Sequence, residues 1–245
     1  MNTRRLPTGL GREPMVVASL GDFSHLLTDA HRAEAEGANL VEVRADLFPK
    51  TQLKPILLQR ALKKLKKSVK CRLLLTLRMG EEGGGLSPKF REQDRLALFR
   101  AGLSEADGVD VELAAVDINR HVVFEAHKRG RFVVLSAHHF KKIPSKQVLT
   151  GLVRKFRRFE GDVLKVAVKV SSKSEAAHLM EFCSKCPVPR KVFIPMGSKG
   201  QEARLNGFSS GTCLTYGYVR KALAPGQLSV KAIVSSISQY KIAKK

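Results

Sequence analysis

Lys165 interrupts an apolar, β-type run that extends from Asp162 to Val168. A lysine inside a buried strand loses its hydration, and this loss favours the neutral amine over the ammonium. A neutral amine attacks carbonyl carbons, so a desolvated lysine is a candidate Schiff-base nucleophile. The alternative is a lysine near a strand end whose ammonium reaches water. Because other strands repeat the pattern of Lys165, the nucleophile is favoured.

A proton-transfer group is expected beside this amine, because forming an imine and removing a proton next to it both require one. His138 is the candidate, since it ends the strand that precedes the lysine's, whereas His139 points the opposite way. A carboxylate commonly orients such a histidine. Glu82 can supply it from a loop that the glycines at 83–85 allow to bend, and Glu81 competes for that role.

Further polar residues near strand ends suit a polar, anionic small molecule. Arg204 opens a predicted helix, where its guanidinium can clamp a carboxylate in a bidentate manner. Arg44, Arg78 and Glu42 can hold neighbouring hydroxyl groups. The turn that ends at Gln227 places an amide at the same rim, although its sequence is also that of an ordinary turn before a helix.

The elements that must position these residues alternate between strand and helix eight times. The predicted strands are Met15–Leu20, Leu40–Arg44, Arg72–Arg78, Val109–Leu113, Phe132–His138, Val163–Val168, Val192–Met196 and Leu214–Val219. The predicted helices lie near 23–36, 52–67, 88–104, 117–129, 145–159, 173–183, 200–206 and 229–241. This order predicts parallel strands joined by crossover helices, and the length is typical of a single (β/α)8 TIM barrel, here residues 15–241. An open doubly wound sheet is the rival, but no glycine-rich nucleotide motif follows the first strand.

Polar side chains occupy alternate positions in five of these strands, opposite aliphatic ones. In a parallel barrel helices cover the outer face, so the polar face must point inward. These residues crowd the C-terminal strand ends, where barrel enzymes carry their chemistry. A buried salt-bridge network without chemistry is the alternative. The residues concerned are Glu42, Arg44, Thr76, Arg78, Asp110, Glu112, Ser136, His138 and Lys165.

Composition indicates a globular protein with a strongly basic surface. The 245 residues are 43% hydrophobic and 27% charged, with a net charge of +22. Such a charge invites a nucleic-acid hypothesis. However, the basic clusters at 63–67, 154–158 and 244–245 fall on predicted helix surfaces or at the tail, without interleaved aromatics. We therefore expect a solvated basic surface that concentrates small anions, and no specific nucleic-acid binding.

The termini and cysteines favour a cytoplasmic protein. Residues 1–14 have no apolar signal segment and are expected to form a short, flexible arm, and residues 242–245 a basic tail. No apolar run approaches the roughly 20 residues that span a bilayer, so no membrane association is expected. Four cysteines are too few for a disulfide scaffold, and the lone pair Cys183 and Cys186 is weak evidence for zinc.

Taken together and in order, these segments resemble the type I 3-dehydroquinate dehydratases. The resemblance spans about residues 15 to 235, and its strength lies in the placement of weak single motifs on successive strands. The segments are Glu42–Asp46, Thr76–Arg78 followed by Glu82–Gly84, Asp110–Leu113, Ser136–Phe140, Lys165–Val168, Met196–Gly197 with Arg204, and Ala224–Gln227.

The resemblance implies a barrel that converts 3-dehydroquinate to 3-dehydroshikimate and water, the third step of the shikimate pathway. The reaction runs through a covalent imine, with no metal or cofactor. Lys165 then matches the imine-forming lysine, His138 the general acid and base, and Glu82 its carboxylate partner. The matched substrate ligands are Ser19, Glu42, Arg44, Arg78, Arg204 and Gln227. The resemblance also implies a homodimer, and after Tyr240 no fused dehydrogenase domain fits in the chain.

The chain departs from the family pattern at two positions. Leu223 stands where the family usually has a substrate-binding serine, so we expect a raised KM rather than a lost reaction. His139 stands where an acidic or amide residue is commoner, which alters the electrostatics beside His138. Two other functions remain open: a class I aldolase, which would share the lysine, and a degenerate barrel that serves as a basic binding module.

Overall fold

The computed structural model describes residues 6–242, and its strands form one parallel sheet in the order β7-β6-β5-β4-β3-β2-β1-β8-β9. The strands are β1 (Met15–Leu20), β2 (Leu40–Arg44), β3 (Arg72–Thr76), β4 (Gly108–Glu112), β5 (Phe132–His139), β6 (Val163–Lys169), β7 (Lys191–Met196), β8 (Leu214–Tyr218) and β9 (Leu228–Ser229). The helices are α1 (Leu26–Ala35), α2 (Pro55–Ser68), α3 (Glu92–Gly102), α4 (Val116–Lys128), α5 (Lys146–Phe159), α6 (Lys173–Lys185), α7 (Gln201–Leu205) and α8 (Val230–Ile242).

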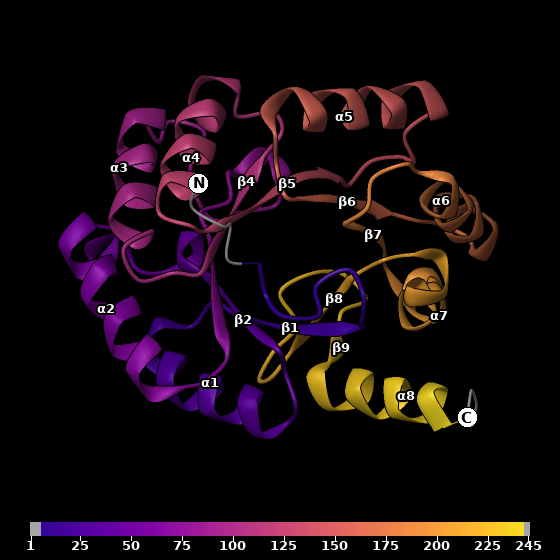
Figure 1. Ribbon diagram of the computed structural model, residues 1–245, viewed down its shortest axis with the longest axis horizontal. Helices are drawn as coiled ribbons and strands as arrows, with labels where there is room; N and C mark the ends of the chain where they lie inside the picture. The colour runs from indigo at the N-terminus through magenta and orange to yellow at the C-terminus, as the bar shows by residue number, and fades with distance from the viewer. Residues whose placement is uncertain (1–5, 243–245) are drawn as a thin grey trace.

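The sheet curls into a barrel with the helices outside it (Figure 1), which confirms the predicted (β/α)8 class. Seven strand pairs from β7 round to β8 are joined by parallel ladders. The last gap, between β7 and β8, is closed by a single bridge between Lys191 and Thr212. There the backbone N–H of Cys213 donates to the carbonyl of Lys191 at 2.9 Å. The barrel is therefore least tightly joined at this seam.

Local sequence signals explain where several helices begin. Ser145 precedes α5 and its hydroxyl accepts the backbone N–H of Val148, and Ser172 caps α6 in the same way. Pro55 occupies the first turn of α2, where its missing N–H has no cost. The described helices therefore begin close to the predicted positions.

Several element boundaries differ from the predicted ones by a few residues, and two differences have tertiary reasons. Strand β3 ends at Thr76 rather than Arg78, because the next residues bend away toward the loop that carries Glu82. The carbonyl of Arg78 there accepts the N–H of Leu86 at 3.2 Å instead of a ladder bond. The short strand β9 was not predicted, since it consists of a single pair of residues added beside β8.

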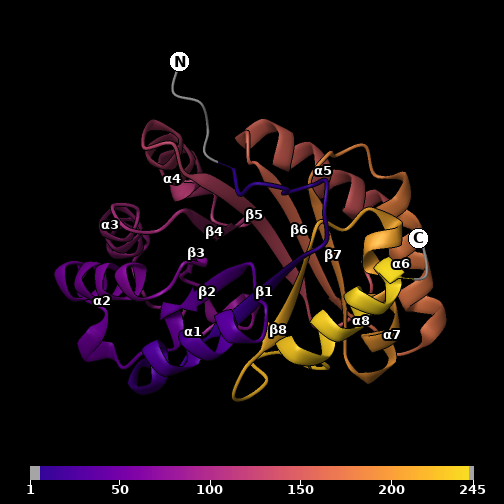
Figure 2. The ribbon, with the colours of Figure 1, turned by 60° about the horizontal axis from the view of Figure 1, so that its bottom comes forward.

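The barrel interior is apolar at one end and polar at the other. Side chains near the N-terminal strand ends, such as Met15, Leu40 and Phe132, form an inner core that is separate from the layer beneath the helices. The described part of the N-terminal arm crosses this end (Figure 2), and Leu10 is buried in the inner core. Access to the interior is consequently from the C-terminal strand ends.

Arg95 of α3 supports that open end from outside the barrel. Its side chain is completely buried and donates to Glu112 at 2.7 Å and to the carbonyl of Leu77 at 3.2 Å. The second carboxylate oxygen of Glu112 accepts the backbone N–H of Met79 at 2.8 Å. One buried ion pair thus joins a helix, the end of β4 and the loop after β3.

We expect Arg95→Leu to lower the free energy of unfolding by about 3–5 kcal/mol, because Glu112 would remain buried without its hydrogen-bonded cation. Urea denaturation of the variant and of the unaltered protein measures the difference. Arg91→Leu is the matched control, since Arg91 pairs with Asp94 on the surface and its side chain is 75% exposed. That change should cost less than about 1 kcal/mol. Equal losses for the two variants would contradict the supporting role of Arg95.

Candidate active site

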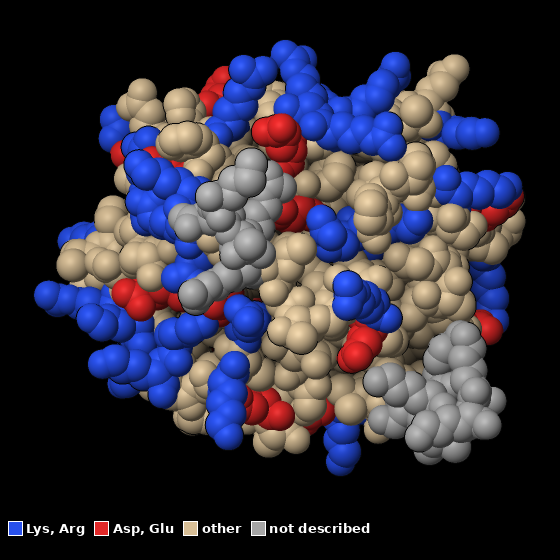
Figure 3. All heavy atoms as spheres, viewed as in Figure 1, with Lys and Arg blue, Asp and Glu red and all other residues tan. Residues whose placement is uncertain are grey.

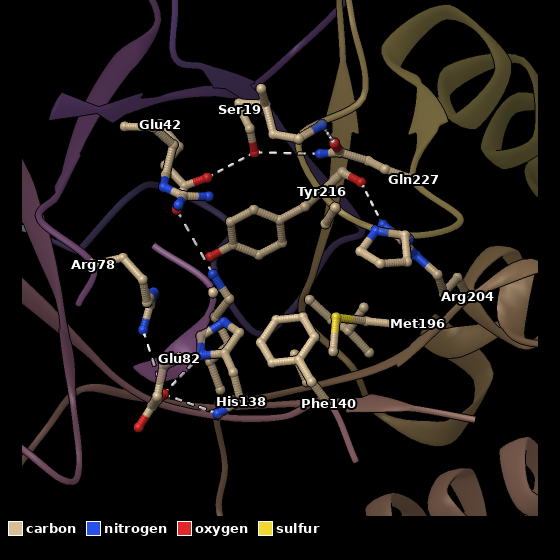
Figure 4. Close-up of a pocket in the computed structure, with 18 residues that line it drawn as sticks. Ser19, Glu42, Arg78, Glu82, His138, Phe140, Met196, Arg204, Tyr216 and Gln227 are labelled. Atoms are coloured by element: carbon tan, nitrogen blue, oxygen red, sulfur yellow. Dashed lines mark hydrogen bonds and ion pairs between the residues drawn. The ribbon is translucent and has the colours of Figure 1, made fainter. Parts of the chain in front are cut away.

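A cavity of about 180 Å³ opens among the C-terminal strand ends. All nine residues that the sequence predicted as candidates line it, although they come from strands and loops spread along the whole chain. Figure 4 shows Arg204 and Gln227 on one side and Glu82, Arg78 and His138 on the other. The nine residues are Ser19, Glu42, Arg44, Arg78, Glu82, His138, Lys165, Arg204 and Gln227.

Lys165 lies deep in this cavity, with only 4% of its surface exposed. It does not extend to bulk water, so the strand-end alternative is wrong. Its Nζ donates to Asp110 Oδ2 at 3.0 Å and lies 3.7 Å from Glu42 Oε1. The same atom sits 3.9 Å from the centroid of the Tyr216 ring. Two carboxylates and one aromatic face therefore surround the amine.

Asp110 connects Lys165 to Arg78. Arg78 donates to Asp110 at 2.8 Å and to Ser136 at 2.6 Å, and the Ser136 hydroxyl donates to Asp110 at 2.7 Å. Burial by itself would raise the pKa of Asp110, but Arg78 and Lys165 lower it to about 2. Asp110 is thus a fixed negative charge in the cavity wall. The sequence placed it on the polar face but did not select it as a site residue.

His138 and Glu82 form a pair across the cavity rim. Glu82 Oε2 lies 3.0 Å from His138 Nδ1 and also accepts the backbone N–H of His138 at 2.9 Å. The choice between the two glutamates is settled by position, because Glu81 is exposed and Glu82 faces the histidine. A proton on Nδ1 directed at the carboxylate leaves the lone pair of Nε2 available to accept a proton.

The charge states of this pair follow from burial. Burial, together with the positive charges of Arg78 and Lys165, lowers the pKa of His138 well below 6.5. Burial raises the pKa of Glu82 to about 7, although Arg78 opposes the rise. His138 is accordingly neutral at neutral pH, which is the state that a general base requires.

Glycines after β3 let the Glu82 loop approach the rest of the rim closely. A Cβ on Gly84 would lie 2.0 Å from the carbonyl oxygen of Arg78, and one on Gly85 would lie 2.2 Å from that of Asp46. Gly83 has a φ of +75°, and a Cβ there would overlap the ring of Phe140. The glycines thus fix a tight loop in place, in addition to the bending expected from the sequence.

The end of β2 presents Glu42 and Arg44. Glu42 accepts the Ser19 hydroxyl at 2.7 Å and the Thr76 hydroxyl at 2.8 Å. Arg44 makes a two-bond ion pair with Asp46, at 3.0 and 2.8 Å. Ser19 also lies 3.4 Å from the amide nitrogen of Gln227. These polar groups face the cavity with part of their hydrogen-bonding capacity already engaged.

Arg204 differs from the other cations of the cavity. It is 5% exposed, and in the described part of the chain its partners are two backbone carbonyls, those of Gly226 at 3.0 Å and Tyr216 at 2.7 Å. Burial lowers its pKa to about 10, so it remains charged at neutral pH. A buried guanidinium without a carboxylate partner is well suited to bind an anion.

Further residues that line the cavity were not selected from the sequence as site residues, among them Tyr216, Phe140 and Met196. Phe140 stacks on His138, with ring centroids 6.5 Å apart and planes at 15°. Met196 and Tyr216 lie in largely apolar or aromatic strands, whose sequence does not distinguish a cavity wall from core, and Phe140 stands between two histidines and two lysines. Among residues 6–242, no cluster of three or more His, Cys, Asp or Glu could hold a metal ion.

Comparison with known proteins agrees with this geometry. The family model of type I 3-dehydroquinase matches residues 16–244. A 3-dehydroquinate dehydratase of Methanosarcina acetivorans is 31% identical over 243 residues, covering 96% of this chain and 98% of that protein. One from a Hydrogenobaculum species is 30% identical over 202 residues, covering 82% of this chain and 88% of that protein.

A solved structure shows the same fold. The crystal structure of 3-dehydroquinate dehydratase from Geobacillus kaustophilus superimposes with a TM-score of 0.89, covers 100% of both chains and is 24% identical. With the family model matching nearly the whole length, the chain belongs to the type I 3-dehydroquinase family.

Proposed function

We propose that this protein dehydrates 3-dehydroquinate to 3-dehydroshikimate through a Schiff base on Lys165. The observation that carries the proposal is a buried lysine in the same cavity as a neutral histidine paired with a carboxylate. The family relationship supports the substrate, since its named members are 3-dehydroquinate dehydratases. Arg204 supports it as well, because the substrate carries a carboxylate.

In the first step, the Lys165 amine attacks the substrate ketone at C3. The ammonium must first give up a proton, and the Glu42 carboxylate, 3.7 Å from Nζ, is the acceptor within reach, while Asp110 stays ionised. A carbon–nitrogen bond forms, water leaves, and a cationic imine results. This imine withdraws electrons from the neighbouring C2, which makes the C2 proton acidic.

In the second step, His138 removes the C2 proton through Nε2, and the electron pair moves into the imine to form an enamine. His138 then returns this proton to the C1 hydroxyl as that group departs as water. Hydrolysis of the imine releases the product and restores Lys165. Glu82 serves this step by holding Nδ1, so that one nitrogen of His138 keeps a fixed role.

The substrate is oriented by the two sides of the cavity. Arg204 and Gln227 lie opposite Glu82 and His138 (Figure 4), so a carboxylate bound there directs the ring toward the reacting groups. Glu42 and Ser19 are placed to contact ring hydroxyls. Arg44 and Arg78 contribute charge at the same end, although each already has an acidic partner.

We also propose a pathway, a cellular location and an oligomeric state for this enzyme. We place the enzyme in the shikimate pathway, as a cytoplasmic homodimer. All four cysteines are free and buried, which is compatible with a reducing compartment. Over the residues that the structure describes, no helix has the length and apolar character needed to cross a membrane.

Borohydride reduction in the presence of 3-dehydroquinate should attach the substrate carbon skeleton to Lys165, as located by peptide mass spectrometry. Lys165→Met should give neither adduct nor turnover, because no other amine replaces Nζ. His138→Ala should still form the adduct, slowly, while turnover falls by about 100-fold or more. A folded protein that forms no adduct would contradict the Schiff-base mechanism.

The pH dependence of kcat should report the ionisation of Glu82. Since burial raises its pKa to about 7, Glu82 is protonated below that pH and ionised above it. If the carboxylate must hold Nδ1–H, kcat rises with pH through about 7 and then levels off. His138, whose pKa is lowered, is already neutral there. In Glu82→Gln this rise should vanish and kcat should fall at least about tenfold; an unchanged profile would exclude Glu82 as its source.

Leu223→Ser should lower KM. Leu223 lines the cavity beside Gln227, whose side-chain oxygen accepts its backbone N–H at 2.8 Å. An aliphatic side chain there leaves a substrate hydroxyl without a partner, and restoring the donor should improve KM about fivefold or more. Leu223→Ala is the control, since it removes bulk without adding a donor. Equal effects of the two changes would show that space, not hydrogen bonding, limits affinity.

A further inference from the structure

Tyr216 of β8 occupies the middle of the cavity, between the Arg204 side and the His138 side (Figure 4). The residue is 4% exposed, and its hydroxyl has no hydrogen-bond partner among the described residues. Its ring faces the Lys165 Nζ at 3.9 Å from the centroid. A polar atom is therefore held unpaired next to the nucleophile, although burying an unpaired hydroxyl is unfavourable for stability.

The other hydroxyl donors nearby are already engaged. Ser136 donates to Asp110, and both Ser19 and Thr76 donate to Glu42. Tyr216 is the cavity hydroxyl that has a proton to donate and no acceptor in the described structure. Burial, with the negative charges of Glu42 and Asp110, raises the pKa of Tyr216 well above 10, so it keeps that proton.

We propose that Tyr216 is a further catalytic residue, which assists formation of the Schiff base at Lys165. Its hydroxyl donates a hydrogen bond to the substrate ketone oxygen while Nζ attacks the carbonyl carbon. Its ring then faces the nitrogen as that atom becomes a cationic imine, a favourable cation–π arrangement. This inference rests on the proposed function, since it concerns the imine-forming step of that reaction.

The step balances without a proton from Tyr216. The amine lone pair forms the carbon–nitrogen bond, and the π electrons of the ketone move to its oxygen, which gains a proton to give a carbinolamine. The carbon–oxygen bond then breaks, the oxygen leaves as water, and the nitrogen lone pair forms the imine. Overall, the ammonium and the ketone give a protonated imine and water, and both protons of the water come from the ammonium. Tyr216 stabilises the charge that develops on the oxygen.

Tyr216→Phe tests the hydroxyl, because the change removes one oxygen atom and retains the ring. In single-turnover experiments with 3-dehydroquinate, the rate at which the borohydride-trapped adduct appears on Lys165 should fall at least about tenfold. The loss of an oxyanion donor typically lowers rates by about 100- to 1000-fold. The melting temperature should stay the same or rise, since the lost hydroxyl was unpaired.

A second readout separates a chemical role from a structural one. With substrate deuterated at C2, the isotope effect on turnover should shrink in Tyr216→Phe, because imine formation becomes more rate-limiting than proton removal. Tyr216→Leu, which also removes the aromatic face, should lose more adduct-forming rate than Tyr216→Phe. Tyr218→Phe is the matched control, since Tyr218 belongs to the same strand but does not line the cavity.

The outcomes separate this inference from the proposed function. If the unaltered protein forms no adduct, the Schiff-base proposal fails and the role of Tyr216 fails with it. If the unaltered protein forms the adduct and Tyr216→Phe forms it equally fast, only the role of Tyr216 is overturned. A slower rate accompanied by a lowered melting temperature and an unchanged isotope effect would likewise overturn it, as the mark of a structural residue.

Discussion

The need to neutralise charge inside the barrel governs how the open end of this protein is built. A charged side chain away from water is stable only when it is paired and hydrogen-bonded. Arg78, Asp110 and Lys165 are each no more than 4% exposed, and they form one continuous chain of ion pairs that joins the loop after β3 to β4 and β6. Each strand that supplies a charge must therefore hold its register against the strands that supply the partners.

The pairing of buried charges also involves the outer layer of helices. Glu112 lies near Arg78 at 3.9 Å, but its strong partner is Arg95 of α3, at 2.7 Å. Because Glu112 also binds the backbone of Met79, the position of the Glu82 loop depends on a residue outside the barrel. The histidine–carboxylate pair is thus positioned from both sides: by the backbone of β5 within the barrel and by α3 behind it.

Much of this arrangement could be predicted, because two regularities act together. A side-chain period of two places alternate residues on one face of a strand, and parallel strands bring their C-terminal ends to one rim. These rules were enough to bring Glu42, Lys165 and His138 into one cavity. They do not distinguish a reacting group from its partner, so Asp110 was not selected, although it contacts Lys165 directly.

Features that depend on tertiary contacts could not be predicted. The residues alone left Glu81 as a competitor of Glu82, which only the family resemblance selected, and in the fold it is Glu82 that faces His138. In the sequence, nothing distinguishes Tyr216 from the other residues of its strand. Its buried hydroxyl, which has no hydrogen-bond partner among the described residues, becomes evident only in the folded chain. Local pattern therefore specifies which face of the strand a residue occupies, and packing specifies what it does there.

The positive charges of this protein lie both on its outer surface and inside the cavity. Lysine and arginine side chains gather along the edges formed by α2 and α5 (Figure 3), where residues such as Lys63, Lys67 and Arg154 are exposed. Inside the cavity, Arg44, Arg78 and Lys165 each have acidic partners, whereas among the described residues Arg204 has backbone carbonyls as its partners. The basic surface raises the local concentration of any anion, whatever its shape. On the function that we propose, selection among anions falls to Arg204, where the substrate carboxylate would bind while its ring lies between Tyr216 and His138.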